Sequence, residues 1–232
     1  MMTAHLTVLS AYATGHVSFM GTDLVAARGA LVPRQETELL GWAALGILNE
    51  LPPGTAPRLV DMCCGAGNLV CGITSKSPGL RAWASDLTDG AVAVARANVE
   101  RLDLSSRIQV CQGDLFEPLA GLDLEASVDV VVCNPPYIST GKLARDRAEL
   151  LVHEPRAAFD GGPFGISILA RVVRDALTFL KPGGMLLFEV GVGQDEMVSR
   201  LFSRTGSYAP VITFTDDQGR PRVVGARKQA VR

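Results

Sequence analysis

Short runs of β-branched and other apolar residues alternate along the chain with longer stretches in which apolar side chains recur every three or four positions. The first pattern is typical of buried strands and the second of amphipathic helices. The predicted strands cover residues 58–61, 80–86, 107–111, 128–133 and 185–190. The predicted helices cover residues 68–75, a segment that Thr88 can cap at its N-terminus, residues 167–180 and the segment from Asp195 to Arg204. Because strands and helices alternate, we expect an α/β fold with a mainly parallel sheet and helices on both faces.

Local signals mark the ends of several elements in the C-terminal half. The helix over 167–180 is expected to stop at Lys181-Pro182-Gly183-Gly184. The helix from Asp195 carries acidic residues in its first turn, basic residues near its end and a glycine just past it, which is the order that the helix dipole favours. Apolar runs at 211–215 and 222–226 flank the polar turn 216–220, which predicts a terminal antiparallel hairpin.

The N-terminal part of the chain gives weaker signals. Residues 17–32 are interpreted as a small hairpin and residues 35–50 as a leading helix, whereas residues 1–16 are too short for a domain and are interpreted as a mobile segment or a lid. The predicted domains are an N-terminal extension over residues 1–50 and a catalytic domain over residues 51–232.

Composition narrows the class of protein. The chain has 232 residues, of which 47% are hydrophobic and 20% charged, so it can bury a core and is not intrinsically disordered. A net charge of −2 disfavours a non-specific nucleic-acid binder. Neither a run of the ~18–20 apolar residues that span a bilayer nor a signal peptide is evident, so no membrane partner is expected. Five cysteines, an odd number, favour a reducing cytoplasm over a secreted disulfide framework.

A glycine-containing turn follows the first predicted strand of the sheet. It runs from Asp61 through Cys63, Gly65 and Gly67 to Asn68, which opens a helix. Small residues let the backbone approach a ligand, and a helix N-terminus offers free N–H groups. A turn of this kind is often only a tight connection, so it predicts a ligand site only in combination with other signals.

Acidic residues follow the next two strands. Asp86, with Leu87 after it, lies about 20 residues beyond the glycines, where a carboxylate suits the two hydroxyls of a ribose. Gly113, Asp114 and Leu115 follow the third strand, where a carboxylate can accept a hydrogen bond from an adenine amino group while apolar neighbours contact the ring. Each aspartate has an ordinary alternative, as a helix cap or as a loop residue.

The fourth strand ends in Asn134-Pro135-Pro136-Tyr137. The two prolines fix the backbone, so the Asn134 side-chain oxygen and the Pro135 carbonyl can both accept from one planar NH2 group while Tyr137 lies against its face. Such a nitrogen is a poor nucleophile because its lone pair is delocalised. Aimed acceptors let charge develop on it, and preorganised groups of this kind are worth on the order of 10²–10³ in rate.

These four motifs stand in order at strand ends and together predict an S-adenosylmethionine site. The chain resembles class I S-adenosylmethionine-dependent methyltransferases, specifically the release factor glutamine N5-methyltransferase family. The resemblance covers about residues 19–228 and includes the stretches 31–38, 134–138, 153–162 and 188–191. It implies a Rossmann-like sheet, mostly parallel with a C-terminal antiparallel hairpin.

The resemblance also implies roles for individual residues. Asn134, Pro135 and Tyr137 are expected to be catalytic. The cofactor is expected to contact Asp61, Cys63, Gly65, Gly67, Asn68, Asp86, Leu87, Gly113, Asp114, Leu115 and Asn134. The substrate is expected to contact Arg34, Glu36, Pro136 and Tyr137.

The sequence departs from the family pattern in three places. Cys63-Cys64 stand where glycine and threonine are usual, and Gln35 replaces a second proline. About 18 residues precede the resemblance, whereas the family carries a helical N-terminal domain that docks its protein substrate. We therefore expect weak docking of a full-length release factor.

Three functions remain open on the sequence. The leading hypothesis is methyl transfer to a planar or amine nitrogen of a small, peptide or carrier-bound substrate, with a role in secondary metabolism. The second is a cyclase that directs the cofactor's own amine onto its γ-carbon, forming azetidine-2-carboxylate and methylthioadenosine. The third is a non-catalytic accessory protein. Adenine methylation in DNA shares the Asn-Pro-Pro-Tyr chemistry, but the acidic charge disfavours it. The oligomeric state stays open.

No metal site is expected. The five cysteines lack any Cys-x-x-Cys spacing and the chain has only three histidines, so the cysteines are interpreted as small buried residues.

Overall fold

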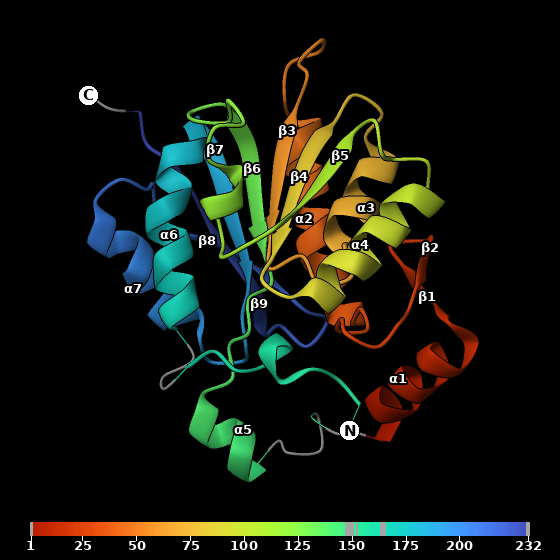
Figure 1. Ribbon diagram of the computed structural model, residues 1–232. Helices are drawn as coiled ribbons and strands as arrows, with labels where there is room; N and C mark the ends of the chain where they lie inside the picture. Colours follow the sequence, from red (N-terminus) through yellow and green to blue (C-terminus); the bar gives the residue numbers. More distant parts are fainter. Residues whose placement is uncertain (1, 147–150, 152, 163–165, 231–232) are drawn as a thin grey trace.

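The computed structural model describes residues 2–146, 151, 153–162 and 166–230, with side chains from residue 8 onward except that of residue 146. Its centre is a seven-stranded sheet with the order β5-β4-β3-β6-β7-β9-β8 (Figure 1). The strands are β3 (Arg58–Met62), β4 (Arg81–Asp86), β5 (Ile108–Gln112), β6 (Val128–Cys133), β7 (Leu180–Glu189), β8 (Ile212–Thr215) and β9 (Pro221–Arg227). β9 runs antiparallel to both of its neighbours, and the other neighbouring pairs are parallel. The predicted fold class is confirmed.

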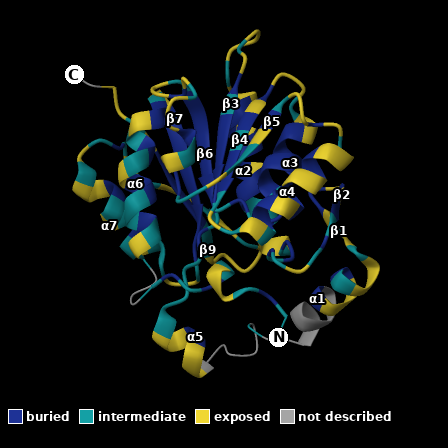
Figure 2. Cartoon of the chain, in the orientation of Figure 1, coloured by how far each residue is buried: buried dark blue, intermediate teal, exposed yellow. Residues whose placement is uncertain are grey.

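Helices cover both faces of this sheet. On one face lie α2 (Glu38–Asn49), α3 (Asn68–Lys76) and α4 (Asp89–Arg101), and on the other lie α6 (Ser167–Phe179) and α7 (Asp195–Thr205). Side chains alternate along the central strand β6. Val130 and Val132 join the first core, whereas Val131 and Cys133 join the second. Every residue of β6 is buried, as Figure 2 shows for the middle of the sheet, and this explains why the strand is a continuous apolar run.

The start of β7 corrects one prediction. The expected strand over 185–190 begins five residues earlier, at Leu180, directly after α6. Val128 pairs with Leu180 and Val130 pairs with Met185, so residues 181–184 bulge out between the paired positions. Gly183 has a positive φ of 80° there. The Lys-Pro-Gly-Gly signal therefore marks both the end of the helix and an irregular strand, not a separate loop.

The N-terminal part forms α1 (Met2–Thr14), β1 (His16–Phe19), β2 (Thr22–Val25) and the 3-10 turn η1 (Gln35–Thr37) before α2. No helix is predicted from the sequence over residues 1–16, where α1 lies. The predicted hairpin exists but is shorter than residues 17–32, because the strands pair only from His16 to Val25. The division into domains at residue 50 stays a prediction.

The loops that follow β3, β4, β5 and β6 gather at one edge of the sheet, the lower edge in Figure 1. β3 lies between β4 and β6, so the chain passes to opposite sides of the sheet there, and crevices for ligands open at such points. α1 and α5 (Thr140–Asp146) lie beyond the same edge. No helix in the described part of the chain is long and apolar enough to cross a membrane.

Candidate active site

A cavity of about 250 Å³ lies at this edge of the sheet. Its wall comes from the turns after β3, β4, β5 and β6, from residues 29–31, from residues 155–158 and from the start of α6. The predicted site residues on the wall are Cys63, Gly65, Asn68, Asp86, Leu87, Asp114, Leu115, Asn134 and Pro136. One cavity thus brings together residues from all four predicted motifs.

The other predicted site residues are not on the cavity wall. These are Arg34, Glu36, Asp61, Gly67, Gly113, Pro135 and Tyr137. Gly67 caps α3 with a φ of 76°, and a Cβ there would come within 3.2 Å of Ala95. A Cβ on Gly113 would lie 2.9 Å from Pro118. These two glycines therefore serve close packing behind the wall.

The turn after β3 has an unusual backbone. Cys63 has a φ of 57°, Gly65 of 55° and Gly67 of 76°. Positive φ suits glycine but strains a residue with a Cβ. Leu115, also on the cavity wall, has a φ of 50°. Of the six non-glycine residues with a positive φ in the described part of the chain, Cys63 and Leu115 border this cavity.

Asp61 lies beneath this turn and is fully buried. Its Oδ2 accepts from Val70 N at 3.0 Å, whereas its Oδ1 has no hydrogen-bond partner in the described part of the protein. Burial raises the pKa of Asp61 to about 8, and the negative charge of Asp86 adds to the increase. The carboxyl group therefore braces the start of α3, and its raised pKa favours the protonated form.

Asp86 joins the turns after β3 and β4. Its Oδ2 accepts from Gly65 N at 3.0 Å, and its Oδ1 accepts from the backbone N–H and the hydroxyl of Thr88 at 3.0 and 3.1 Å. The Thr88 hydroxyl also caps α4 by accepting from Ala91 N, as the sequence predicted. A carboxylate has about four acceptor positions. Asp86 therefore has an acceptor position left for a ligand, and a further position becomes free if the Thr88 hydroxyl rotates away.

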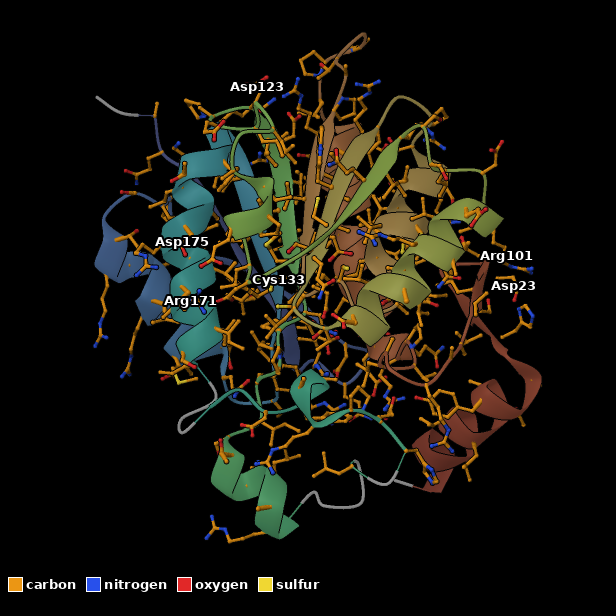
Figure 3. The ribbon with its side chains drawn as sticks, in the orientation of Figure 1. Asp23, Arg101, Asp123, Cys133, Arg171 and Asp175 are labelled. Atoms are coloured by element: carbon orange, nitrogen blue, oxygen red, sulfur yellow. The ribbon has the colours of Figure 1, made fainter. Side chains whose placement is uncertain are left out.

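Asp114 has a partner that sequence analysis missed. Arg171 of α6, labelled in Figure 3, donates to its Oδ2 at 2.8 Å. Both side chains lie on the cavity wall. The arginine comes 57 residues later in the chain, and nothing in its helical segment distinguishes it from a solvated charge. The neighbouring apolar surface comes from Leu87, Leu115 and Ile168.

The Asn-Pro-Pro-Tyr loop is held from behind. Asn134 Nδ2 donates to Thr37 Oγ1 at 3.3 Å, and Gln194 donates to the Tyr137 carbonyl at 3.0 Å. The Tyr137 hydroxyl donates to Glu189 Oε1 at 3.3 Å. Burial, followed by the negative charge of Glu189, raises the pKa of Tyr137 well above its ordinary value. Tyr137 is thus a neutral anchor beside the cavity.

Two covering segments are tied together over the site. Arg34 forms an ion pair with buried Glu154, whose other oxygen accepts from Val32 N at 2.9 Å. This pair joins the N-terminal segment that supplies residues 29–31 to the loop that supplies residues 155–158. Glu154 was not among the predicted site residues, although it lies in the resembling stretch 153–162.

The described residues hold no group of three or more His, Cys, Asp or Glu side chains that could bind a metal ion. All five cysteines are free. Cys63 and Cys64 lie on the cavity wall, and Cys64, Cys71 and Cys133 are buried.

Comparisons with known proteins agree with this geometry. Residues 43–166 match the family described as "Methyltransferase small domain". The chain is 36% identical over 211 residues to a release factor glutamine methyltransferase of Moorella thermoacetica, covering 91% of this chain and 72% of that protein.

Solved structures share the fold. A methyltransferase of Pyrococcus furiosus matches with a TM-score of 0.63 at 14% identity, over 99% of this chain and 100% of that one. A release factor-specific protein-(glutamine-N5) methyltransferase of Alicyclobacillus acidocaldarius matches with a TM-score of 0.51 at 23% identity, over 88% of this chain and 99% of that one.

Proposed function

This chain belongs to the release factor glutamine methyltransferase family, a group of class I S-adenosylmethionine-dependent methyltransferases, and we propose that its acceptor is the side-chain amide nitrogen of a glutamine in a protein. Of the small, peptide and carrier-bound substrates that the sequence leaves open, this proposal selects a peptide. The relatives in this family favour neither the cyclase nor the accessory protein.

The position of Asn134 carries the proposal. Its Nδ2 is engaged with Thr37, so its Oδ1 is left for the cavity on whose wall Asn134 lies. An amide NH2 group has two protons to donate, and Asn134 Oδ1 and the Pro135 carbonyl are two acceptors on adjacent residues. These acceptors bind the nitrogen more strongly as it becomes pyramidal in the transition state than they bind the planar amide of the substrate. They therefore lower the activation barrier of methyl transfer.

The donor end of the cavity fits S-adenosylmethionine, which supplies an electrophilic methyl group. We propose that Asp86 accepts from the ribose hydroxyls with its remaining lone pairs, while Asp114 accepts from the adenine amino group beside Leu87 and Leu115. Arg171 holds Asp114 in place for that contact. The first turn, with Cys63, Gly65 and Asn68, faces the methionine end.

The residues behind the wall have supporting roles in this proposal. Asp61 and Gly67 fix the first turn against α3, and Gly113 donates to the Asp86 carbonyl at 3.0 Å. Pro136 contacts the glutamine on the cavity side, and Tyr137 fixes the loop. Arg34, through Glu154, holds the segments that cover the cavity, and exposed Glu36 meets the protein substrate at its rim.

We place the reaction in the cytoplasm and expect no nucleic-acid or membrane partner. The free cysteines support a reducing compartment.

The test is incubation of the protein with S-adenosylmethionine and a full-length release factor, followed by mass spectrometry of the digested substrate. We expect a single added methyl group on a glutamine and S-adenosylhomocysteine as the co-product. The same reaction on a short peptide around that glutamine measures how much the rest of the release factor contributes to docking.

A parallel incubation with S-adenosylmethionine alone is the control. Methylthioadenosine formed in that tube would support the cyclase instead, and an unmodified release factor would count against the proposed acceptor.

A further inference from the structure

The segment that follows the N-terminal hairpin crosses α4 in direct backbone contact. Gly29 lies against Gly90, the second residue of α4. A Cβ on Gly90 would lie 3.0 Å from the Cα of Gly29 and 3.2 Å from its carbonyl oxygen, and a Cβ on Gly29 would lie 3.1 Å from the Cα of Gly90. These are backbone atoms, which cannot rotate away as the end of a side chain can. An alanine at either position therefore requires one of the two segments to move.

The local structure of α4 does not explain Gly90. Glycine is a weak helix former, and Gly90 lacks the positive φ that favours glycine elsewhere in the described chain. Gly29 differs in this respect, because its φ of 106° by itself favours glycine. The close crossing with Gly29 accounts for glycine at position 90.

The segment that crosses α4 forms part of the cavity. Residues 29–31, called the cover strip below, lie on the cavity wall together with Ala91 of α4. Ala30 is 3% exposed and belongs to a small buried cluster that includes Ala66, from the turn after β3, and Ala91. The cover strip therefore packs against both the first turn and α4 along one side of the cavity.

Further contacts hold the cover strip from other segments. The Tyr12 hydroxyl of α1 donates to the Ala30 carbonyl at 3.3 Å. Directly after the strip, Val32 N donates to Glu154 at 2.9 Å, and Glu154 precedes residues 155–158 of the cavity wall. The position of the strip thus depends on the crossing with α4 and on hydrogen bonds with two distant parts of the chain.

Resting on the cofactor site of the proposed function, we propose that Gly90 positions the cover strip against S-adenosylmethionine and thereby sets how slowly the cofactor dissociates. Gly90 itself does not lie on the cavity wall. It acts by letting the strip come close enough to α4 for Ala30 to join its buried cluster. A Cβ at position 90 displaces the strip and loosens that side of the cavity.

The chemistry of the strip separates binding from turnover. Its side chains are those of Gly29, Ala30 and Leu31, which are apolar and do not respond to charge that develops during methyl transfer. They therefore bind the ground state and the transition state alike. Displacement of the strip should raise the Kd and the KM for S-adenosylmethionine and leave kcat within about twofold of wild type. A tenfold fall of kcat at saturating cofactor would contradict this role.

The first experiment compares Gly90→Ala with Gly46→Ala. Both place an alanine in a helix, but Gly46 of α2 is exposed and a Cβ there meets nothing within 4 Å. Release of methyl-labelled S-adenosylmethionine is followed after addition of excess unlabelled cofactor. We expect the dissociation rate constant to rise about tenfold in Gly90→Ala and to stay within about twofold of wild type in Gly46→Ala.

Equal dissociation from wild type and Gly90→Ala would overturn the proposal. No methyl acceptor is present in this experiment, so its outcome does not depend on which molecule the protein methylates. It can therefore fail while the proposed glutamine acceptor holds, and it can succeed while that acceptor proves wrong.

The second experiment uses a milder change and decides the matter if Gly90→Ala does not fold. Tyr12→Phe removes only the hydroxyl that binds the Ala30 carbonyl, so dissociation should become about two- to threefold faster. Tyr208→Phe is the matched control, because the Tyr208 hydroxyl also donates to a backbone carbonyl, that of Val173 at 2.8 Å, and Tyr208 is not on the cavity wall. That variant should lose stability, measured as a melting temperature, and keep wild-type dissociation. With Gly90→Ala unfolded, wild-type dissociation from Tyr12→Phe would overturn the proposal.

The third experiment observes the strip directly. Hydrogen exchange, measured by mass spectrometry on a peptide covering residues 26–34, reports on the Val32 N–H that is bonded to Glu154. We expect saturating S-adenosylmethionine to slow this exchange in the wild type, and Gly90→Ala to exchange faster than wild type without cofactor. Gly46→Ala should exchange as wild type does. Exchange that is unchanged in Gly90→Ala would contradict the positioning role.

Discussion

The wall formed by the turns after β3 and β4 is held by bonds between neighbouring strand ends, as when Gly65 N binds Asp86 and Cys64 N donates to the Ser85 carbonyl at 3.1 Å. The wall formed by Asn134 depends on distant partners. Asn134 meets Thr37 across 97 residues of chain, and Tyr137 meets Glu189 across 52. The two walls can therefore be disturbed separately. We expect the first wall, formed by the turns after β3 and β4 and called the cofactor wall below, to control cofactor binding, and the wall formed by Asn134 to control turnover.

The largest effect on turnover is expected from Asn134→Ala. The substitution removes the acceptor oxygen that strengthens as charge develops on the nitrogen, so kcat should fall by roughly 10²-fold or more. Calorimetry with S-adenosylmethionine should give a Kd close to that of wild type, because the loss arises in the transition state. A large loss of affinity with normal turnover would assign Asn134 to the cofactor wall instead.

The largest effect on binding is expected from Asp86→Ala. Loss of charge-assisted bonds to the ribose should weaken S-adenosylmethionine by about 1–3 kcal/mol, measured by calorimetry. Asp217→Ala in the exposed C-terminal hairpin removes the same charge from a residue that does not line the cavity and should leave affinity unchanged. Equal affinities of wild type and Asp86→Ala would remove Asp86 from the cofactor wall.

The pKa of Asp61 gives the cofactor wall a dependence on pH. Because burial raises this pKa to about 8, the folded protein holds a proton that the unfolded chain has lost above the ordinary pKa of 3.8. The free energy of unfolding should therefore fall as pH rises from about 4 to about 8, by at most about 1.4 kcal/mol per pH unit from this group.

Asp61→Asn imitates the protonated acid and should remove that part of the dependence. Denaturant unfolding without cofactor, at several pH values between 5 and 9, measures the difference between the two proteins. The free energy of unfolding of Asp61→Asn should exceed that of wild type by an amount that increases with pH and levels off above about pH 8. Parallel curves would mean that Asp61 is ionised in the folded protein.

The smallest effect is expected from Cys63→Gly. Glycine adopts a φ of 57° without strain. Relief of that strain should raise the free energy of unfolding by about 0.5–1 kcal/mol, and the entropy that glycine loses on folding reduces this gain. A matched Cys71→Gly substitution, inside α3, should instead destabilise the protein. Destabilisation by both substitutions would show that the Cys63 side chain contributes more than its backbone strain costs.

The same difference between the walls explains what the sequence could predict. Each strand and the turn after it are local, so the strand over 128–133, the Thr88 cap and Asp86 could be assigned from residue types and spacing. Thr37, Glu154 and Arg171 could not, because each acts through a partner 57 to 120 residues away. Glu189 lies in a resembling stretch, but Tyr137 and Arg222 become its neighbours only when β7 pairs with β6 and with β9.

Single-turnover methyl transfer to the release factor, at saturating S-adenosylmethionine, tests the separation of the two walls most directly when Asn134→Ala and Asp86→Ala are measured side by side. We expect a rate constant reduced by roughly 10²-fold in Asn134→Ala and near wild type in Asp86→Ala once the cofactor site is filled. Equal reductions in both variants would contradict it, because the two walls would then act as one unit.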